Sequence, residues 1–299
     1  MHKKFKTVLF IGILQIPCFL LYSIFFTWPM IQVVYLSLFE WNGMVRVPKI
    51  FIGLQNFIAL LQNIDFYRSL ENSLIFVLVA VVVIMPISFL LALLLNSGLR
   101  GTGFFKSAYY IPSVLPTAVA GLLWAFMLSS PGGSLNPDGV ITQVIQAFLG
   151  SDIHIRWLSS KELAIWSVTM VQSWRLIGFY MLFFLTGLTS IPREIIEAAI
   201  ADGAGSFKRL VYIIIPNMKE TFKIFLILNL AGAFQIFDIV YIMTMGGPGN
   251  ATQVPVTLLY NYSFRFYGSF GYGAAIGVVI LIISMVIAAV TNHKLNQED

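Results

Sequence analysis

Charged side chains are scarce in this sequence. Asp, Glu, Lys and Arg make up only 10% of the 299 residues, 58% are hydrophobic, and the mean hydropathy is +0.86. Soluble domains carry about 25% charged residues, because polar surface must cover their apolar core. The composition therefore excludes a water-soluble globule and predicts that membrane lipid covers most of the protein.

Cysteine and basic runs are also lacking. The one cysteine, Cys18, lies in an apolar stretch, which excludes an internal disulfide framework and a cysteine-ligated metal cluster. The net charge of +5 is not gathered into a basic run or into a basic patch interleaved with aromatic residues. Nucleic acid is therefore not expected as a partner.

The residue patterns of common enzymes are absent as well. His2, His154 and His293 are scattered, and the sequence has no His-Glu-x-x-His or Gly-x-Ser-x-Gly pattern. Residues 98–103 resemble a phosphate-binding loop, but Phe104 stands where such a loop requires lysine. We expect no catalytic residue, no metal site and no cofactor in this chain.

Long apolar stretches are what the sequence has instead. A bilayer core about 30 Å thick is crossed by roughly 20 apolar residues in a helix, whose backbone satisfies its own hydrogen bonds. The predicted fold class is all-α, a polytopic membrane protein with a single transmembrane domain over residues 1–299. The first stretch follows Lys3, Lys4 and Lys6 without a cleavage signal, so we expect it to remain as the first membrane helix. The six predicted spans cover residues 8–36, 74–95, 107–128, 163–188, 222–245 and 272–290.

The distribution of Lys and Arg predicts the orientation. With both termini in the cytoplasm, segments 1–7, 96–106, 189–223 and 291–299 hold 11 of the 18 basic residues, whereas the longer outer segments hold 6. Because basic residues favour the cytoplasmic side, the sequence predicts cytoplasmic termini.

One outer segment carries an amphipathic pattern. After residues 136–138, apolar residues recur at helical spacing from Val140 to Leu149. This pattern predicts a short helix that lies either on the membrane surface or against a partner.

The longest inside segment, residues 189–216, predicts another short helix. Ser190 can cap it, Pro192 and Glu194 suit its first turn, and Gly203 suits the left-handed residue beyond its end. A helix of roughly ten residues is marginal in isolation. We therefore expect it to dock against something.

Motifs in this segment and along the chain point to one family. They are Glu197-Ala198-Ala199, Asp202-Gly203-Ala204 and Pro216 in the segment, and Gly53-Leu-Gln-Asn-Phe57, Gly103-Phe-Phe-Lys, Ile111-Pro-Ser-Val-Leu-Pro116, Trp124 and Phe237-Asp-Ile-Val-Tyr-Ile-Met-Thr-Met-Gly-Gly-Pro248 elsewhere. From about residue 7 to residue 292, the chain resembles the permease subunits of binding-protein-dependent ABC importers of the carbohydrate type. The departures are Leu210, where the family usually has an aromatic residue, and the absence of a frequent proline near Glu220.

The resemblance implies a role for the inside segment and a set of partners. In that family the short helix lies in a cleft of a cytoplasmic ATPase and transmits its closing to the membrane helices. The implied partners are a second permease subunit, two ATPase subunits that bind ATP and Mg, an extracytoplasmic solute-binding protein and a sugar. The implied location is a bacterial or archaeal cytoplasmic membrane. The residues implied in ATPase coupling are Glu197, Ala198, Ala199, Asp202, Gly203 and Ala204.

Polar residues inside the predicted spans are candidates for contact with a solute, because such residues usually face the bundle interior or a water-filled cavity. Gln172, Leu176 and Phe179 share one helix face, as do Asn229 and Ala233 with Ile236 on the next span, and the resemblance places both faces on the solute path. Amides suit sugar hydroxyls and aromatic rings suit the apolar face of a sugar, although amides also bond neighbouring helices. The candidate substrate-binding residues are Gln172, Arg175, Leu176, Phe179, Asn229, Ala233, Gln235 and Asp238.

Two further questions stay open at the level of sequence. Arg175 and Asp238 could form an intramembrane ion pair, or Arg175 could bind an acidic group of the substrate. Gly273 and Gly277 allow close helix contact, either with a second permease or with a neighbour in the same chain.

A self-sufficient secondary transporter or channel is the alternative function. Such proteins often contain inverted repeats with broken helices in matching positions, and the two halves of this chain show no convincing self-similarity.

Overall fold

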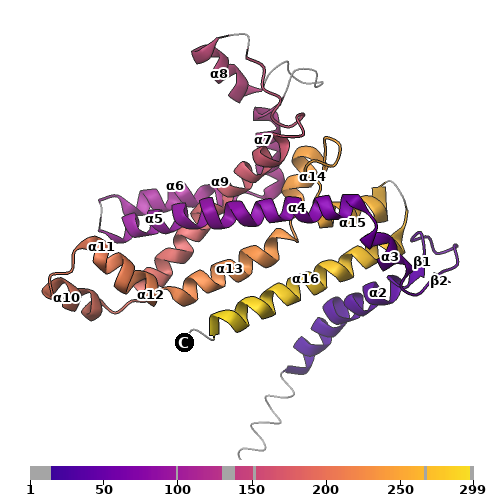
Figure 1. The fold of residues 1–299 in the computed structure, drawn as a ribbon, viewed down its shortest axis with the longest axis horizontal. Helices are drawn as coiled ribbons and strands as arrows, with labels where there is room; N and C mark the ends of the chain where they lie inside the picture. The colour runs from indigo at the N-terminus through magenta and orange to yellow at the C-terminus, as the bar shows by residue number, and fades with distance from the viewer. Residues whose placement is uncertain (1–14, 99, 130–138, 151–152, 266–267, 297–299) are drawn as a thin grey trace, which may run out of the picture. The chain divides into compact units, whose positions relative to one another are not determined.

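The computed structural model describes residues 15–98, 100–129, 139–150, 153–265 and 268–296 (Figure 1). These residues are mostly helical, and they form two compact units. Of the described residues, the first unit combines 15–63 with 259–281, and the second combines 64–258 with 282–296.

The first unit begins with an apolar helix over Gln15–Leu36, in which the π-helical segment η1 (Ser23–Thr27) precedes α2 (Trp28–Leu36). It corresponds to the first predicted span, of which residues 8–14 lie outside the described residues. Strands β1 (Phe39–Glu40) and β2 (Ile50–Phe51) then pair antiparallel, with Phe39 opposite Phe51, and are followed by α3 (Gln55–Leu61).

The C-terminal part of the first unit packs closely against its N-terminal part. Helix α15 (Pro255–Tyr260) and segment η4 (Asn261–Arg265) lead to α16 (Phe270–Asn296). A Cβ atom at Gly271 would collide with the carbonyl oxygen of Phe39, and one at Gly273 would collide with the side chain of Ser263. The Gly273 and Gly277 pair therefore serves neighbours within the same chain.

The second unit starts with a long continuous helix made of α4 (Ile64–Val79), η2 (Ala80–Ile84) and α5 (Met85–Asn96). The predicted span began only at residue 74, because a search for apolar stretches leaves out first turns that carry polar residues such as Asp65. A carboxylate such as Asp65 is nevertheless favoured at a helix N-terminus, and the helix begins there.

The predicted span 107–128 is not one straight helix. It consists of α6 (Thr102–Val114) and α7 (Thr117–Met127), which are bent by 90° relative to each other. Pro116 lacks an N–H group and restricts the preceding residue, so Leu115 adopts an extended conformation. The next predicted helix is confirmed as α8 (Val140–Leu149), where the indole of Trp157 donates a hydrogen bond to Thr142.

Helix α9 (Ala164–Thr189) is the central helix of the second unit and matches the predicted span 163–188. Half of its most apolar window is buried, a larger share than in any other long apolar helix of the described residues. It packs against α5 and α6. A Cβ atom at Gly178 would collide with the backbone carbonyl of Tyr109 in α6, so glycine permits this close contact.

Replacing Gly178 by alanine should therefore separate α6 from α9. We expect the free energy of unfolding to fall by about 1–3 kcal/mol, as in overpacked protein interiors. Thermal unfolding in detergent measures the effect. Gly103→Ala is the matched control, because a Cβ atom at Gly103 in α6 meets no atom within 4 Å. Equal unfolding temperatures for the two variants would contradict the close contact.

Short helices connect α9 to the last elements of the unit. They are α10 (Arg193–Ala201), α11 (Ser206–Arg209), η3 (Leu210–Ile214) and α12 (Ile215–Asn217).

The predicted span 222–245 is a second bent pair. Helix α13 (Lys219–Ala233) and α14 (Asp238–Thr244) are separated by a short break and bent by 45°. The described residues thus contain four helices that are long and apolar enough to cross a membrane, and up to six spans if each bent pair counts as one.

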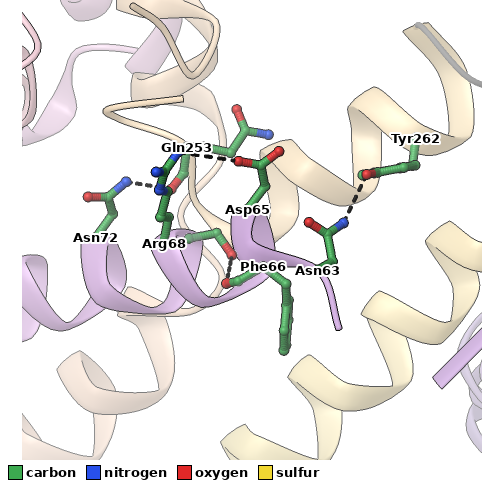
Figure 2. Close-up of polar contacts among 8 residues, drawn as sticks. Asn63, Asp65, Phe66, Arg68, Asn72, Gln253 and Tyr262 are labelled. Atoms are coloured by element: carbon green, nitrogen blue, oxygen red, sulfur yellow. Dashed lines mark hydrogen bonds and ion pairs between the residues drawn. The ribbon is translucent and has the colours of Figure 1, made fainter. Parts of the chain in front are cut away.

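A polar cluster fastens the start of α4 to the segment after α14. Figure 2 shows the amide of Asn72, which donates to the carbonyl oxygen of Gln253 at 2.8 Å, and the ion pair of Arg68 with Asp65 at 3.8 Å. The backbone of Gly246 has φ +87°, and a side chain there would collide with that of Gln253. The Gly-Gly-Pro motif therefore forms a tightly packed turn.

Candidate functional site

A cavity of about 190 Å³ lies in the second unit, and we call it the helical cavity. Three helices and the break after α13 form its walls. Its lining residues are Phe76, Ala80, Ile84, Thr169, Gln172, Ser173, Leu176, Tyr180, Leu228, Asn229, Gly232, Ala233 and Ile236.

Half of the predicted substrate-binding residues line this cavity: Gln172 and Leu176 on α9, and Asn229 and Ala233 on α13. The predicted face of the fifth span, with Ile236 as its third member, is thus reproduced in full. Arg175, Phe179, Gln235 and Asp238 are not among the lining residues.

The face of α9 that lines the cavity is rotated relative to the predicted one. Phe179 is half-exposed and packs its ring against Tyr180, which lines the cavity in its place. The spacing i, i+4, i+7 led to Phe179, whereas i, i+4, i+8 from Gln172 leads to Tyr180, and both are compatible with a helix of 3.6 residues per turn. Helical spacing alone does not choose between Phe179 and Tyr180.

The amide of Gln172 has one atom in a contact with Arg175 and another that is available to the cavity. Its Oε1 atom accepts a hydrogen bond of 3.2 Å from the guanidinium group of Arg175. No hydrogen bond between described residues uses its Nε2 atom. Gln172 can therefore donate to a solute while Arg175 holds the orientation of its amide.

Asn229 is buried, and its Nδ2 atom donates to the backbone carbonyl of Phe225 one turn earlier, at 2.9 Å. Asn229 and Tyr180 both line the cavity wall. Tyr180 also packs against the ring of Phe225, with ring centroids 4.6 Å apart.

Of the two roles left open for Arg175, the ion pair with Asp238 is not formed in this structure. Both residues are described, and no distance of 4.0 Å or less joins their charged groups; Arg175 bonds to Gln172 instead. The Nε atom of Arg175 is buried without a hydrogen-bond partner. Asp238 is exposed in the first turn of α14, where a carboxylate is favoured by the helix dipole.

Three other polar or aromatic residues of the spans contact neighbouring helices. The amide of Gln235 lies 3.5 Å from the hydroxyl of Ser284 in α16, which is the helix-bonding role left open by the sequence. Trp124 and Trp174 pack edge to face, with ring centroids 5.4 Å apart.

The inside segment contains its predicted helix as α10 (Arg193–Ala201), but the cap is different. Ser190 ends α9 and donates its hydroxyl to the carbonyl of Gly187, so the prediction that it caps the next helix is wrong. The cause is local, because Pro192 fixes an extended residue directly before Arg193. Helix α10 ends at Ala201, and Gly203 takes the left-handed conformation with φ +77° as predicted.

The residues of the Glu-Ala-Ala motif differ in exposure. Glu197 and Ala198 are exposed, whereas Ala199 is buried. Asp202 and Gly203 are exposed beyond the end of the helix, and Ala204 is half-buried. Glu197 also lines a cleft of about 470 Å³ between α10 and the ends of α5 and α9, with Arg193 one turn away.

No group of three or more His, Cys, Asp or Glu residues lies close enough to hold a metal ion in the part of the chain that the structure describes.

Comparisons with known proteins agree with the motifs. Residues 84–294 match the family model of the binding-protein-dependent transport system inner membrane component. The probable ABC transporter permease protein YurN of Bacillus subtilis is 32% identical over 272 residues, which cover 90% of each chain. The arabinooligosaccharides transport system permease protein AraP of the same species is 32% identical over 277 residues, 92% of this chain and 85% of AraP.

A solved structure supports the fold. A bacterial alginate ABC transporter, in complex with an alginate pentasaccharide-bound periplasmic protein, contains a chain with a TM-score of 0.82 and 20% identity. The match covers 97% of this chain and 95% of that chain.

The family match extends over more than half of the chain, and the two relatives are transport permeases rather than enzymes. The chain is therefore a multi-pass membrane protein of the inner membrane, and it belongs to the family of binding-protein-dependent transport system inner membrane components, the ABC importer permeases that its motifs resemble.

Proposed function

We propose that this chain forms half of the translocation pathway for a sugar or sugar derivative. The observation that carries the proposal is the helical cavity, in which the Gln172 and Asn229 amides and the Tyr180 ring lie together in a permease of this family. Directed amide groups suit sugar hydroxyls, and an aromatic ring suits the apolar face of a sugar. The related permease AraP transports arabinooligosaccharides by its name, and this agrees with a carbohydrate substrate.

In this proposal α10 couples the pathway to a separate ATPase. The helix has nine residues, is exposed over most of its surface and carries Glu197 next to Ala198. A helix face with small residues and one carboxylate fits a partner's groove that has a basic group at its mouth. Binding of ATP and Mg belongs to that partner.

Transport then follows alternating access. A second permease completes the pathway, an extracytoplasmic binding protein delivers the sugar, and two ATPase subunits drive the change of orientation. ATP can shift the orientation only if the ATP-bound partners bind one orientation more tightly than the other. Both termini and α10 lie on the cytoplasmic side, as the distribution of basic residues favours.

A secondary transporter or channel is not favoured, because the family members are components of binding-protein-dependent systems. The energy source separates the two functions. We expect proteoliposomes that contain this chain and its partner subunits to take up labelled sugar when ATP is enclosed and the binding protein is added outside. Uptake by this chain alone, driven by a proton or sodium gradient without ATP, would refute the proposal.

A further inference from the structure

A second cavity, formed wholly by the first unit, has a volume of about 530 Å³. We call it the loop pocket. Its walls are the residues around the β1–β2 strand pair, α3, and the residues before and at the start of α16. Its polar and aromatic lining residues include Glu40, Trp41, Asn42, Asn56, Tyr262 and Tyr272.

The frame of the loop pocket is held by hydrogen bonds. Asn63 donates to the hydroxyl groups of Tyr262 and Tyr272, both at 2.9 Å, and the contact with Tyr262 is visible in Figure 2. The Nδ2 atom of Asn56 donates to the carbonyl oxygens of Ser37 at 2.9 Å and Phe39 at 3.0 Å. The pocket is therefore preformed rather than a gap between mobile loops.

Polar groups remain available in this frame. Both donors of Asn56 are used, but its Oδ1 atom accepts no hydrogen bond from a described residue. Asn42 accepts from the backbone of Met44 at 3.0 Å, which leaves its Nδ2 donors for a ligand. The Glu40 carboxylate is exposed and forms no ion pair with any described residue.

Aromatic rings stand beside these polar groups. The indole N–H of Trp41 donates to the carbonyl of Met44 at 3.0 Å, which fixes the ring, and the rings of Tyr262 and Tyr272 pack with centroids 4.6 Å apart. Small-molecule sites in proteins have volumes of about 300–1,000 Å³ and combine apolar or aromatic walls with a few placed polar groups. The loop pocket has this size and this composition.

We propose that the loop pocket binds a neutral saccharide, separately from the helical cavity. Planar acceptors and donors at Glu40, Asn42 and Asn56 match the paired hydroxyl groups of a sugar, and the aromatic walls match its apolar C–H face. Glu40 and Lys49, whose ammonium group lies 4.7 Å from the centre of the Trp41 ring, bring opposite charges to the pocket, and their balance suits a neutral sugar. The sugar class and the placement of the pocket on the extracytoplasmic side rest on the proposed function.

Saturation-transfer NMR on the full chain in lipid nanodiscs tests the proposal, with maltotriose, arabinotriose and lactose as probes. We expect at least one probe to bind, and the double variant Glu40→Gln with Asn42→Ala to weaken its binding at this site about tenfold or more, because hydrogen bonds to charged groups are lost. Glu40→Gln alone keeps the shape of the pocket and should give a smaller loss. Arg46→Gln, an exposed position outside the pocket, is the matched control.

The outcomes separate the two proposals. Binding that is lost only in Gln172→Glu and is unchanged in the double variant would overturn the loop pocket as a sugar site and leave the proposed function standing. Absence of pocket-dependent signals with all three probes would also overturn it. Pocket-dependent binding of the external binding protein without sugar binding would overturn it as well, since the pocket would then be a protein contact. Uptake without ATP would instead overturn the proposed function.

Discussion

Glu197→Lys is expected to insert and fold normally but to lose sugar uptake by at least about tenfold, because it places a cation opposite the basic group expected in the ATPase groove. Glu197 is exposed on α10, so the substitution removes no contact of the buried core. Sugar uptake and ATP hydrolysis by the reconstituted complex, together with the amount of ATPase that copurifies, measure the effect.

Glu194→Lys provides the control for this experiment. Glu194 is exposed in the first turn of the same helix, outside the Glu-Ala-Ala motif. Its loss affects mainly the interaction with the helix dipole, typically about 0.3–1 kcal/mol. Most uptake should therefore remain. Normal uptake and normal ATP hydrolysis in the Glu197→Lys variant would contradict the proposed role of α10 in coupling to the ATPase.

Gln172→Glu has the second large expected effect. The substituted side chain still accepts the hydrogen bond from Arg175, but it no longer offers the Nε2 donor to the helical cavity. We expect the KM for sugar uptake to rise about tenfold, since a lost hydrogen bond leaves a polar group of the bound sugar unpaired. Uptake at several sugar concentrations gives this value.

A second variant on the same helix separates binding from folding. Thr186→Val changes an exposed residue of α9 that does not line the helical cavity, and it should leave the KM unchanged. If Gln172→Glu and Thr186→Val have the same KM, the helical cavity is not the sugar site.

The apolar spans were predictable because a membrane leaves the backbone few choices. Helix α9 deviates from its predicted span by one residue at each end. The breaks in the other spans were harder to foresee. Pro116 gave a signal for the bend between α6 and α7, but Pro112 lies within α6 without ending it. Proline alone therefore does not say where a membrane helix bends.

The residues of the candidate site could be predicted only in part from sequence patterns. The polar residues of the spans pointed to α9 and α13, and these helices do line the helical cavity. Helical periodicity could not decide between Phe179 and Tyr180, because the rotation of α9 depends on its packing against α5 and α6. Arg175 bonds to Gln172 and forms no ion pair with Asp238, and charge patterns alone do not show which of these neighbours the arginine takes.

The loop pocket could not be predicted from sequence patterns, because folding brings its residues together. Its frame joins distant parts of the chain, since the bonds from Asn63 to Tyr262 and Tyr272 link residues 199 and 209 positions apart. Only the folded first unit brings them together.

The most direct test of the central claim is affinity purification of the tagged chain from its native membrane in mild detergent, followed by mass spectrometry of the chains that remain bound. The account predicts that an ATPase and a second permease copurify in a constant ratio to the tagged chain. A stable assembly of this chain alone that transports sugar in liposomes without ATP would contradict it.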